Sequence, residues 1–274
     1  MSAKPEDINL DINCSITLNG IKYSANTNET ILDVSKRNGI EIPHLCFKEG
    51  MRPDGNCRVC VVEIEGERTL QPSCVRKVSD GMVINTENNR VIHSQKVVIE
   101  LLQSDVSKEQ YNPNSELMYW ADKLKVEQIR FPSKIQNKHD FTHPAIAVNL
   151  DACIQCTRCV RACREEQVND VIGYAQRGLS SEIIFDLDDS MGTSTCVGCG
   201  ECVQACPTGA LMPSKDVGQV IPDKKVDSVC PYCGVGCLLT YNIKEDKILF
   251  AEGRDGPANM SRLCVKGRYG FNYV

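Results

Sequence analysis

The chain has 274 residues, a formal net charge of −5, and 17 cysteines beside only 6 Phe and 1 Trp. So few large aromatic side chains favour several small modules over one extended core. The interspersed charges exclude the basic surface of a nucleic-acid or anionic-membrane binder, and the long chain with an odd cysteine count disfavours a secreted disulfide scaffold. Residues 1–7 contain no apolar signal core and no 18-residue apolar run follows them, so we expect a cytoplasmic protein with protein partners and without membrane insertion.

The first predicted module, residues 1–90, begins with a β-hairpin. Residues on both sides of Asn19-Gly20 alternate apolar and polar, and this dipeptide is typical of a type I′ turn. Thr30 and Asp33 can form a capping box at the start of a helix. Residues 61–68 then read as a further strand and turn, so the order of elements predicts a β-grasp domain.

Four cysteines of this module have the spacing C-x10-C-x2-C-x13-C: Cys46, Cys57, Cys60 and Cys74. Two thiolates two residues apart can bind one metal centre from a single turn, and the flanking cysteines complete a four-thiolate cage. Spacing alone leaves a zinc ribbon as an alternative. Residues 43–46 and 55–63 resemble the 2Fe-2S domain of the complex I large subunit and its relatives, which include NAD-linked formate dehydrogenases and multimeric iron hydrogenases. His44 is interpreted as a packing or hydrogen-bonding residue.

Residues 91–144 are predicted to be a helical spacer without a cluster. A helix is expected over residues 91–103, with an apolar face made by Val97, Val98, Leu101 and Leu102. Relatives of this kind continue with an H-x3-C-x2-C-x5-C group, but no cysteine occurs here between Cys74 and Cys153, and residues 115–117 stand at the family's last ligand. We therefore expect no metal in this stretch. Its histidines are interpreted as ordinary surface or capping residues: His93, His139 and His143.

The third predicted module, residues 145–215, contains a repeated C-x2-C-x2-C-x3-C run. Its members are Cys153, Cys156, Cys159 and Cys163, then Cys196, Cys199, Cys202 and Cys206. The runs resemble those of bacterial two-cluster ferredoxins, in which the fourth cysteine of each run binds the other cluster. The resemblance implies one 4Fe-4S cluster on Cys153, Cys156, Cys159 and Cys206, and a second on Cys196, Cys199, Cys202 and Cys163. A pair of zinc sites is the alternative.

The fourth predicted module, residues 222–274, has the spacing C-x2-C-x3-C-x26-C: Cys230, Cys233, Cys237 and Cys264. Two glycines, Gly234 and Gly236, let backbone N–H groups approach cluster sulfurs, and residues 238–243 and 247–251 read as strands. The module resembles the small β-rich 4Fe-4S domain of molybdenum or tungsten enzymes with two pyranopterins, and residues 263–268 are most like formate dehydrogenases. That resemblance implies a 4Fe-4S cluster and an electron-relay role for Lys266.

The expected fold is thus a multi-module α+β chain with one 2Fe-2S and three 4Fe-4S clusters. The order of modules resembles the iron–sulfur part of an NAD-linked formate dehydrogenase, whose catalytic residues have no counterparts here. The resemblance implies an electron-transfer subunit or fragment between a molybdenum or tungsten pterin site on a partner subunit or missing domain and a flavin/NAD(P) or ferredoxin partner. Alternatives are a diaphorase-type subunit of a multimeric hydrogenase and a zinc-bound scaffold. Cys14, at the edge of a predicted strand, is left as a buried or free thiol.

Overall fold

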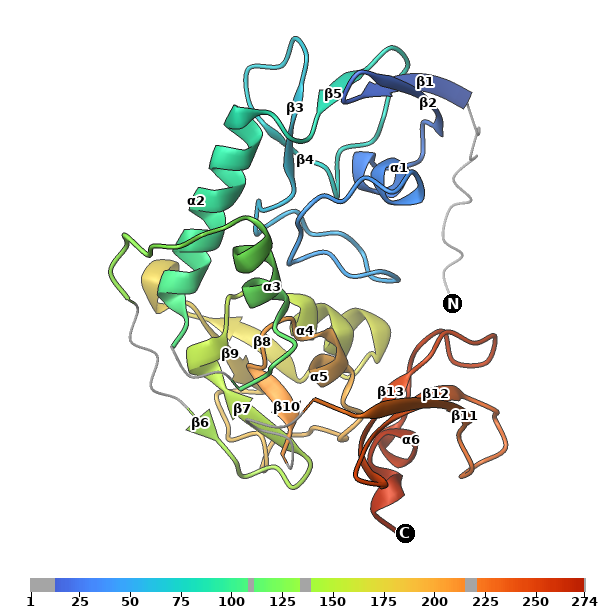
Figure 1. Ribbon diagram of the computed structural model, residues 1–274. Helices are drawn as coiled ribbons and strands as arrows, with labels where there is room; N and C mark the ends of the chain where they lie inside the picture. Colours follow the sequence, from blue (N-terminus) through green and yellow to red (C-terminus); the bar gives the residue numbers. More distant parts are fainter. Residues whose placement is uncertain (1–12, 108–110, 134–138, 215–220, 274) are drawn as a thin grey trace, which may run out of the picture. The chain divides into compact units, whose positions relative to one another are not determined.

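The computed structural model describes residues 13–107, 111–133, 139–214 and 221–273, so the N-terminal segment 1–7 discussed above lies outside the described residues. The described residues form two compact units (Figure 1). The first contains residues 13–47 and 53–99, and the second contains residues 48–52 and the described residues from 100 onwards. The second unit therefore holds both the predicted ferredoxin pair and the predicted fourth module.

The first unit contains a five-stranded sheet with the order β2-β1-β5-β3-β4. Its strands are β1 Asn13–Leu18, β2 Ile21–Asn26, β3 Val61–Ile64, β4 Gln71–Pro72 and β5 Val83–Asn85. β1 pairs antiparallel with β2 and parallel with β5. Asn19 and Gly20 both have positive φ, 49° and 83°, so the predicted type I′ hairpin is confirmed.

Helix α1, Ile31–Arg37, confirms the predicted capping box. The backbone N–H of Asp33 donates to the Thr30 hydroxyl, and the Asp33 carboxylate accepts from the backbone N–H of Thr30 at 2.9 Å. The buried side chains of α1 pack with those of the sheet in one hydrophobic core, which also includes Cys14. Burial is the main cause of the raised pKa of Cys14, as expected for a structural thiol.

Helix α2, Asn89–Asp105, confirms the predicted helix and corrects part of the face that we assigned as apolar. Val91 and Ile99 are fully buried, whereas Leu101 is 42% exposed. Between them Gln95 is also buried, and its amide donates to the carbonyl of Val61 at 3.1 Å. Residues four apart lie on one side of a helix, so this polar member hid the true buried stripe from the hydrophobic pattern.

The second unit begins with short elements around a buried core. Its strands and helices up to residue 214 are α3 Glu116–Lys123, β6 His139–Asp140, β7 Ile146–Asn149, α4 Arg158–Arg161, β8 Ile172–Ala175, β9 Glu182–Phe185, α5 Glu201–Ala205 and β10 Leu211–Pro213. Single turns of 3-10 helix occur at Leu150–Ala152 and Gly178–Ser180, and a π-helical turn at Ala162–Glu166. The strands form a sheet of order β10-β7-β6 and a β8-β9 hairpin. The hairpin lies in the segment that joins the two cysteine runs, between Cys163 and Cys196.

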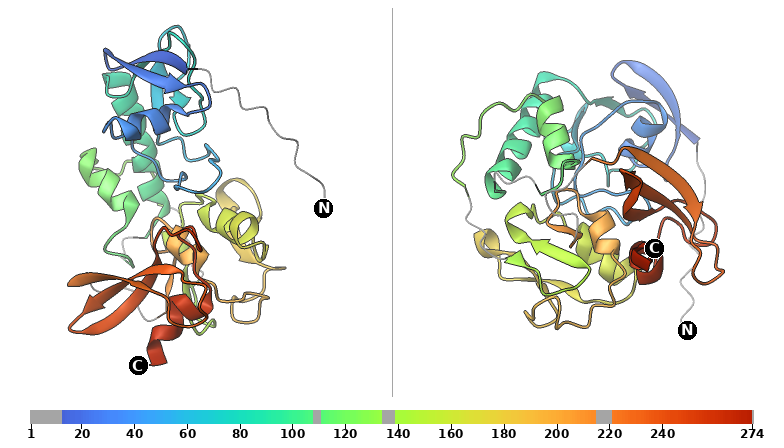
Figure 2. Two further views of the ribbon diagram at one scale, coloured as in Figure 1. Left: turned by 90° about the vertical axis from the view of Figure 1, so that its right-hand side faces the viewer. Right: turned by 60° about the horizontal axis from the view of Figure 1, so that its bottom comes forward.

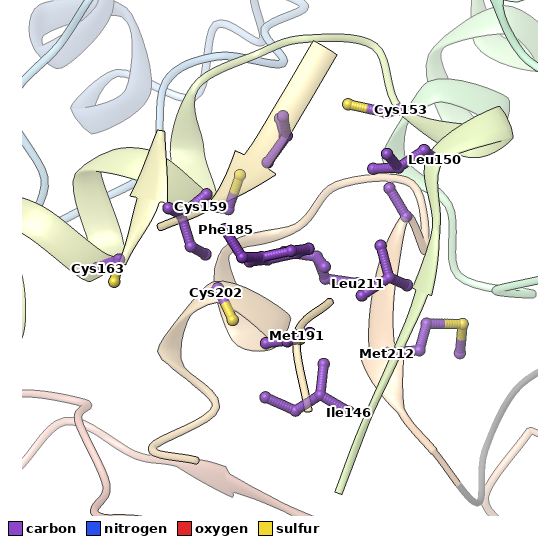
Figure 3. Close-up of a cluster of buried hydrophobic side chains, with 14 of the residues drawn as sticks. Ile146, Leu150, Cys153, Cys159, Cys163, Phe185, Met191, Cys202, Leu211 and Met212 are labelled. Carbon is purple, nitrogen blue, oxygen red and sulfur yellow. The ribbon is translucent and has the colours of Figure 1, made fainter. Parts of the chain in front are cut away.

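Cysteine side chains are part of the core of this unit. Figure 3 shows Phe185 at its centre, with Leu211, Met191, Cys159 and Cys202 around the ring. All five are buried. Because several cysteine thiols are part of this core, metal centres bound to them would be enclosed by protein.

The last part of the second unit is a three-stranded antiparallel sheet. Strands β11 Lys224–Val229, β12 Leu238–Lys244 and β13 Lys247–Gly253 lie in that order, and helix α6, Val265–Tyr269, packs against β13 before a 3-10 turn at Gly270–Tyr273 (Figure 2). The predicted pair of strands and its turn are confirmed, with positive φ at Glu245 and Asp246. Strand β11 was not predicted, because most of its residues are exposed and no buried face marks it. No helix within the described residues is long and apolar enough to cross a membrane.

Candidate metal centres

The four thiols of the first cysteine group converge in the structure. The Sγ atoms of Cys60 and Cys74 are 3.4 Å apart, and the backbone N–H of Cys46 donates to the Sγ of Cys57 at 3.4 Å. Hydrogen bonds from the thiols of Cys57 and Cys74 lower the pKa of Cys46, which shows that these three thiols lie within reach of one another. Cys46, Cys60 and Cys74 are buried and Cys57 is half-buried, so the group is enclosed by protein on most sides.

The sheet and its loops hold this group in place. Cys60 directly precedes β3, and a hydrogen bond of 3.0 Å runs from the N–H of Ser73 to the carbonyl of Cys60, which aligns Cys74 beside it. The His44 ring shares a 2.8 Å hydrogen bond with the carbonyl of Ile42 and packs edge-on against Phe47. The interpretation of His44 as a packing and hydrogen-bonding residue is confirmed.

The eight cysteines of the third module line two separate cavities. One cavity is lined by Cys153, Cys156, Cys159 and Cys206, and the other by Cys163, Cys196, Cys199 and Cys202. These are the two crossed sets that the ferredoxin resemblance implies. Cys159 on helix α4 lines the first cavity, and Cys202 on helix α5 lines the second. The chain after each helix carries a thiol to the other cavity: Cys163 lines the second cavity, and Cys206 lines the first.

The electrostatic environment of the two most buried thiols reflects the same grouping. Burial is the main cause of the raised pKa of Cys159, and the next contributions come from Cys156, Cys153 and Cys206. The pKa of Cys202 is likewise raised by burial and then by Cys199, Cys196 and Cys163. Each buried thiol therefore interacts most strongly with the members of its own set.

The fourth cysteine group is open on one side. Cys230 is buried and Cys237 half-buried, whereas Cys233 and Cys264 are exposed. Burial raises the pKa of Cys237, and Cys230, Cys233 and Cys264 add to that shift, so these four also lie together. The backbone N–H of Cys230 donates to the carbonyl of Cys237 at 2.8 Å and closes the loop that carries the first three.

Helix α6 passes close to this group. A Cβ atom at Gly267 would lie 3.4 Å from the Sγ of Cys230 and 3.3 Å from the Leu263 side chain, so the space between the helix and the thiol is tight at this position. Lys266, one residue earlier, is exposed on α6, two residues after Cys264.

The histidines of residues 91–144 differ in their environments. His93 is exposed, and His139 stacks on Phe141 with ring centroids 5.9 Å apart. His143 is buried, and its Nδ1 accepts the backbone N–H groups of Ala145 and Ile146 at 3.2 Å. His143 is therefore a capping residue, as one of our interpretations allowed, although it is not on the surface.

Three protein families match the chain in sequence order. The 2Fe-2S iron-sulfur cluster binding domain matches residues 13–89, the ferredoxin-like domain of NADH-quinone oxidoreductase subunit 3 matches residues 143–212, and the molybdopterin oxidoreductase Fe4S4 domain matches residues 223–274. An NADH-quinone oxidoreductase component of Rhizobium meliloti is 29% identical over 94% of the chain, and a formate dehydrogenase-like protein of Staphylococcus haemolyticus is 27% identical over 94%. The three matched stretches are all iron–sulfur cluster domains, and we refer to the chain below as an iron–sulfur module. It spans 31% of the length of each of these two relatives.

A solved structure supports the fold of this iron–sulfur module. A chain from the crystal structure of an NAD+-reducing NiFe-hydrogenase in the H2-reduced state aligns with a TM-score of 0.68 at 24% identity. The alignment covers 73% of the present chain and 87% of the hydrogenase chain. This likeness shows a shared fold, while the family models identify the domains for 2Fe-2S and 4Fe-4S clusters.

Sequence reasoning missed the polar residues that hold the ligand loops of the iron–sulfur module. Arg158, next to Cys159, is 2% exposed and makes two hydrogen bonds to the Glu116 carboxylate, at 2.7 and 2.8 Å. Glu116 lies 42 residues earlier in the sequence, at the first position of α3. The signal in the sequence was an arginine directly beside a ligand cysteine, a position that is enclosed when a cluster is bound, because charged side chains are rarely buried unless paired.

Asn259 organises the loop of the fourth module in the same way. Its Oδ1 accepts the backbone N–H of Leu238 at 3.0 Å, and its Nδ2 donates to the carbonyls of Leu238, Arg254 and Arg262 at 2.9 to 3.2 Å. The side chain is buried and joins the segment after Cys237 to the segment before Cys264. It therefore fixes the distance between the third and fourth ligands.

Replacing Asn259 by alanine is expected to lower the free energy of unfolding by about 2 kcal/mol, because several buried backbone groups lose their partner at once. Thermal unfolding followed by circular dichroism measures the change. Asn114, whose side chain is exposed, supplies the control Asn114→Ala, for which we expect no shift. Equal melting curves for both variants would contradict the role given to Asn259.

Proposed function

We propose that this iron–sulfur module transfers electrons between a molybdenum or tungsten pterin site and a flavin/NAD(P) or ferredoxin partner in a formate dehydrogenase-type complex. The observation that supports this most directly is the combination of a molybdopterin oxidoreductase Fe4S4 domain at residues 223–274 with two ferredoxin-type domains before it. The pterin site would lie on a partner subunit or another domain. We propose formate as the substrate because residues 263–268 resemble formate dehydrogenases and because a relative of the chain is formate dehydrogenase-like.

The thiols fit the clusters that this function requires. The first group would hold a 2Fe-2S cluster on a β-grasp frame, since its four thiols converge and its hairpin and parallel β1-β5 pair have the expected order. The two crossed sets would each enclose a 4Fe-4S cluster, and the fourth group would hold a third. Each bound cluster would accept one electron and release it without making or breaking a bond.

The exposure of the fourth group indicates where a partner would approach. Cys233, Cys264 and Lys266 are exposed, while the two ferredoxin-type sets are mostly buried. A pterin-binding domain that covered this face would come within reach of Lys266, to which we assign the electron relay. The chain's other residues would hold the ligands and exclude water around the buried sets.

A diaphorase-type subunit of a multimeric hydrogenase is the second candidate. The similarity to the NAD+-reducing hydrogenase supports a shared fold alone at 24% identity. The Fe4S4 domain at residues 223–274 favours the pterin-linked complex, because a diaphorase-type subunit needs no such domain.

Iron content and electron paramagnetic resonance test the proposed function. After anaerobic purification from the native source, we expect about 14 iron atoms per chain, with one 2Fe-2S signal and several 4Fe-4S signals on reduction. Molybdenum or tungsten should be found in a partner chain identified by mass spectrometry. A colourless chain with stoichiometric zinc would establish the zinc scaffold instead, and a preparation without a pterin partner would overturn the formate assignment.

A further inference from the structure

Arg268 connects the ligand loops of two different cysteine groups. Its backbone N–H donates to the carbonyl of Cys264 at 3.1 Å, and its Nε donates to the carbonyl of Cys199 at 2.8 Å. A third bond runs from Nη1 to the carbonyl of Ala251 at 3.5 Å. One side chain, 3% exposed, thus bridges the fourth group and the set formed by Cys163, Cys196, Cys199 and Cys202.

The ferredoxin side of this bridge is shaped to receive the arginine. Glu201, between Cys199 and Cys202, forms a buried ion pair with the Arg268 guanidinium, and its Oε1 also accepts the N–H of Leu263 at 3.1 Å. Gly200 has a φ of +73°, and a Cβ atom there would overlap the Arg268 side chain. The glycine is needed both for the backbone conformation and for the space.

A second contact joins the same two parts of the unit. Gln204 on α5 accepts the N–H of Gly253 at 3.0 Å and donates to the carbonyl of Ser261 at 3.0 Å. These two hydrogen bonds of Gln204 reach the end of β13 and the loop before α6. The fourth group is therefore held against one ferredoxin-type set, the one that contains Cys199.

We propose that Arg268, fixed by Glu201, is a positioning residue that sets the distance between the fourth cysteine group and the Cys199 set and controls the reduction potential at the Cys199 set. This inference rests on the proposed function, because the two sites exchange electrons only if both hold clusters. One electron would pass between the fourth cysteine group and the Cys199 set, and Arg268 is the residue that joins them.

The charges of the pair predict opposite effects of two substitutions. Reduction adds one negative charge at a cluster, so a nearby cation raises its reduction potential and a nearby carboxylate lowers it. Arg268→Gln leaves the Glu201 carboxylate beside the Cys199 set, and Glu201→Gln leaves the arginine. We expect the potential to fall in the first variant and to rise in the second, each by about 59 mV, a tenfold change in the one-electron equilibrium constant.

Potentiometric titration followed by electron paramagnetic resonance measures the reduction potential at the Cys199 set in both variants at one fixed pH. Arg268→Lys separates charge from geometry, because lysine keeps the cation but cannot reproduce the planar fork of donors. In Arg268→Lys, the reduction potential at the Cys199 set should stay close to that of the unchanged chain, while amide hydrogen exchange of residues 199–204 and 263 becomes at least tenfold faster. Arg130→Gln, which removes the partner of the buried Glu100 carboxylate elsewhere in the unit, serves as the control and should change neither reading.

Shifts in the same direction for Arg268→Gln and Glu201→Gln, or no shift in either, would overturn the electrostatic part of the inference. If Arg268→Gln fails to bind clusters, Glu201→Gln still tests the direction of the shift in reduction potential, and Arg268→Lys still tests the positioning role. Hydrogen exchange needs no cluster, so unchanged exchange in Arg268→Lys would refute the positioning role even in a chain without iron. Absence of iron–sulfur signals from the unchanged chain would instead refute the proposed function.

Discussion

Replacing Cys163 by alanine is expected to remove the same iron–sulfur centre as replacing Cys202, although Cys163 belongs to the first cysteine run. The cavity lined by Cys196, Cys199 and Cys202 takes its fourth thiol from Cys163. By the same geometry, Cys206→Ala should match Cys159→Ala. Each variant should lose about 4 iron atoms, and the paramagnetic resonance spectra should fall into these two matching pairs.

Cys14→Ala is the matched control for this experiment, because Cys14 is a buried thiol in the core of the first unit, apart from the first cysteine group. It should retain all of the iron. A spectrum of Cys163→Ala that matched Cys159→Ala would mean that each run binds its own cluster. Loss of both centres in every variant would show that the two cannot form separately, and would leave the crossed assignment unsupported.

Replacing Glu116 by alanine is expected to lower the free energy of unfolding by about 3 kcal/mol, because it removes the carboxylate partner of a buried arginine. Burial lowers the pKa of Arg158, but the hydrogen bonds and charge of Glu116 outweigh this effect and the net shift is upward. Without the carboxylate, the guanidinium loses two charge-assisted hydrogen bonds in a site that is 2% exposed. Denaturant unfolding measures the change.

An exposed ion pair provides the control for this substitution. Glu67 bonds Arg76 at 2.7 Å, the same length, but the Arg76 side chain is 44% exposed. Glu67→Ala should therefore change the free energy of unfolding by less than about 1 kcal/mol. If the two variants were equally stable, burial of Arg158 would not be what makes its ion pair important.

Local features of the chain could be predicted from the sequence. The Asn19-Gly20 turn, the Thr30 capping box and the strands on either side of Glu245-Asp246 depend on residues close together in the sequence. Cysteine spacing also predicted which thiols lie together, because a resemblance to two-cluster ferredoxins supplied the long-range exchange of ligands.

Contacts between distant residues could not be predicted in this way. Glu201 and Arg268 are 67 residues apart, and each alone looks like an ordinary charged residue. The buried face of α2 was predicted only in part, because its central member, Gln95, is polar and donates to a carbonyl 34 residues earlier. Polar groups buried with a remote partner leave no periodic pattern to detect.

The open side of the fourth cysteine group has a chemical consequence. Iron held beside two exposed thiols, those of Cys233 and Cys264, can be reached by dioxygen and by chelators, whereas the thiols of the two ferredoxin-type sets lie mostly within protein. If the proposed function holds, a partner domain that covered this face would shield the centre from oxidation as well as exchange electrons with it.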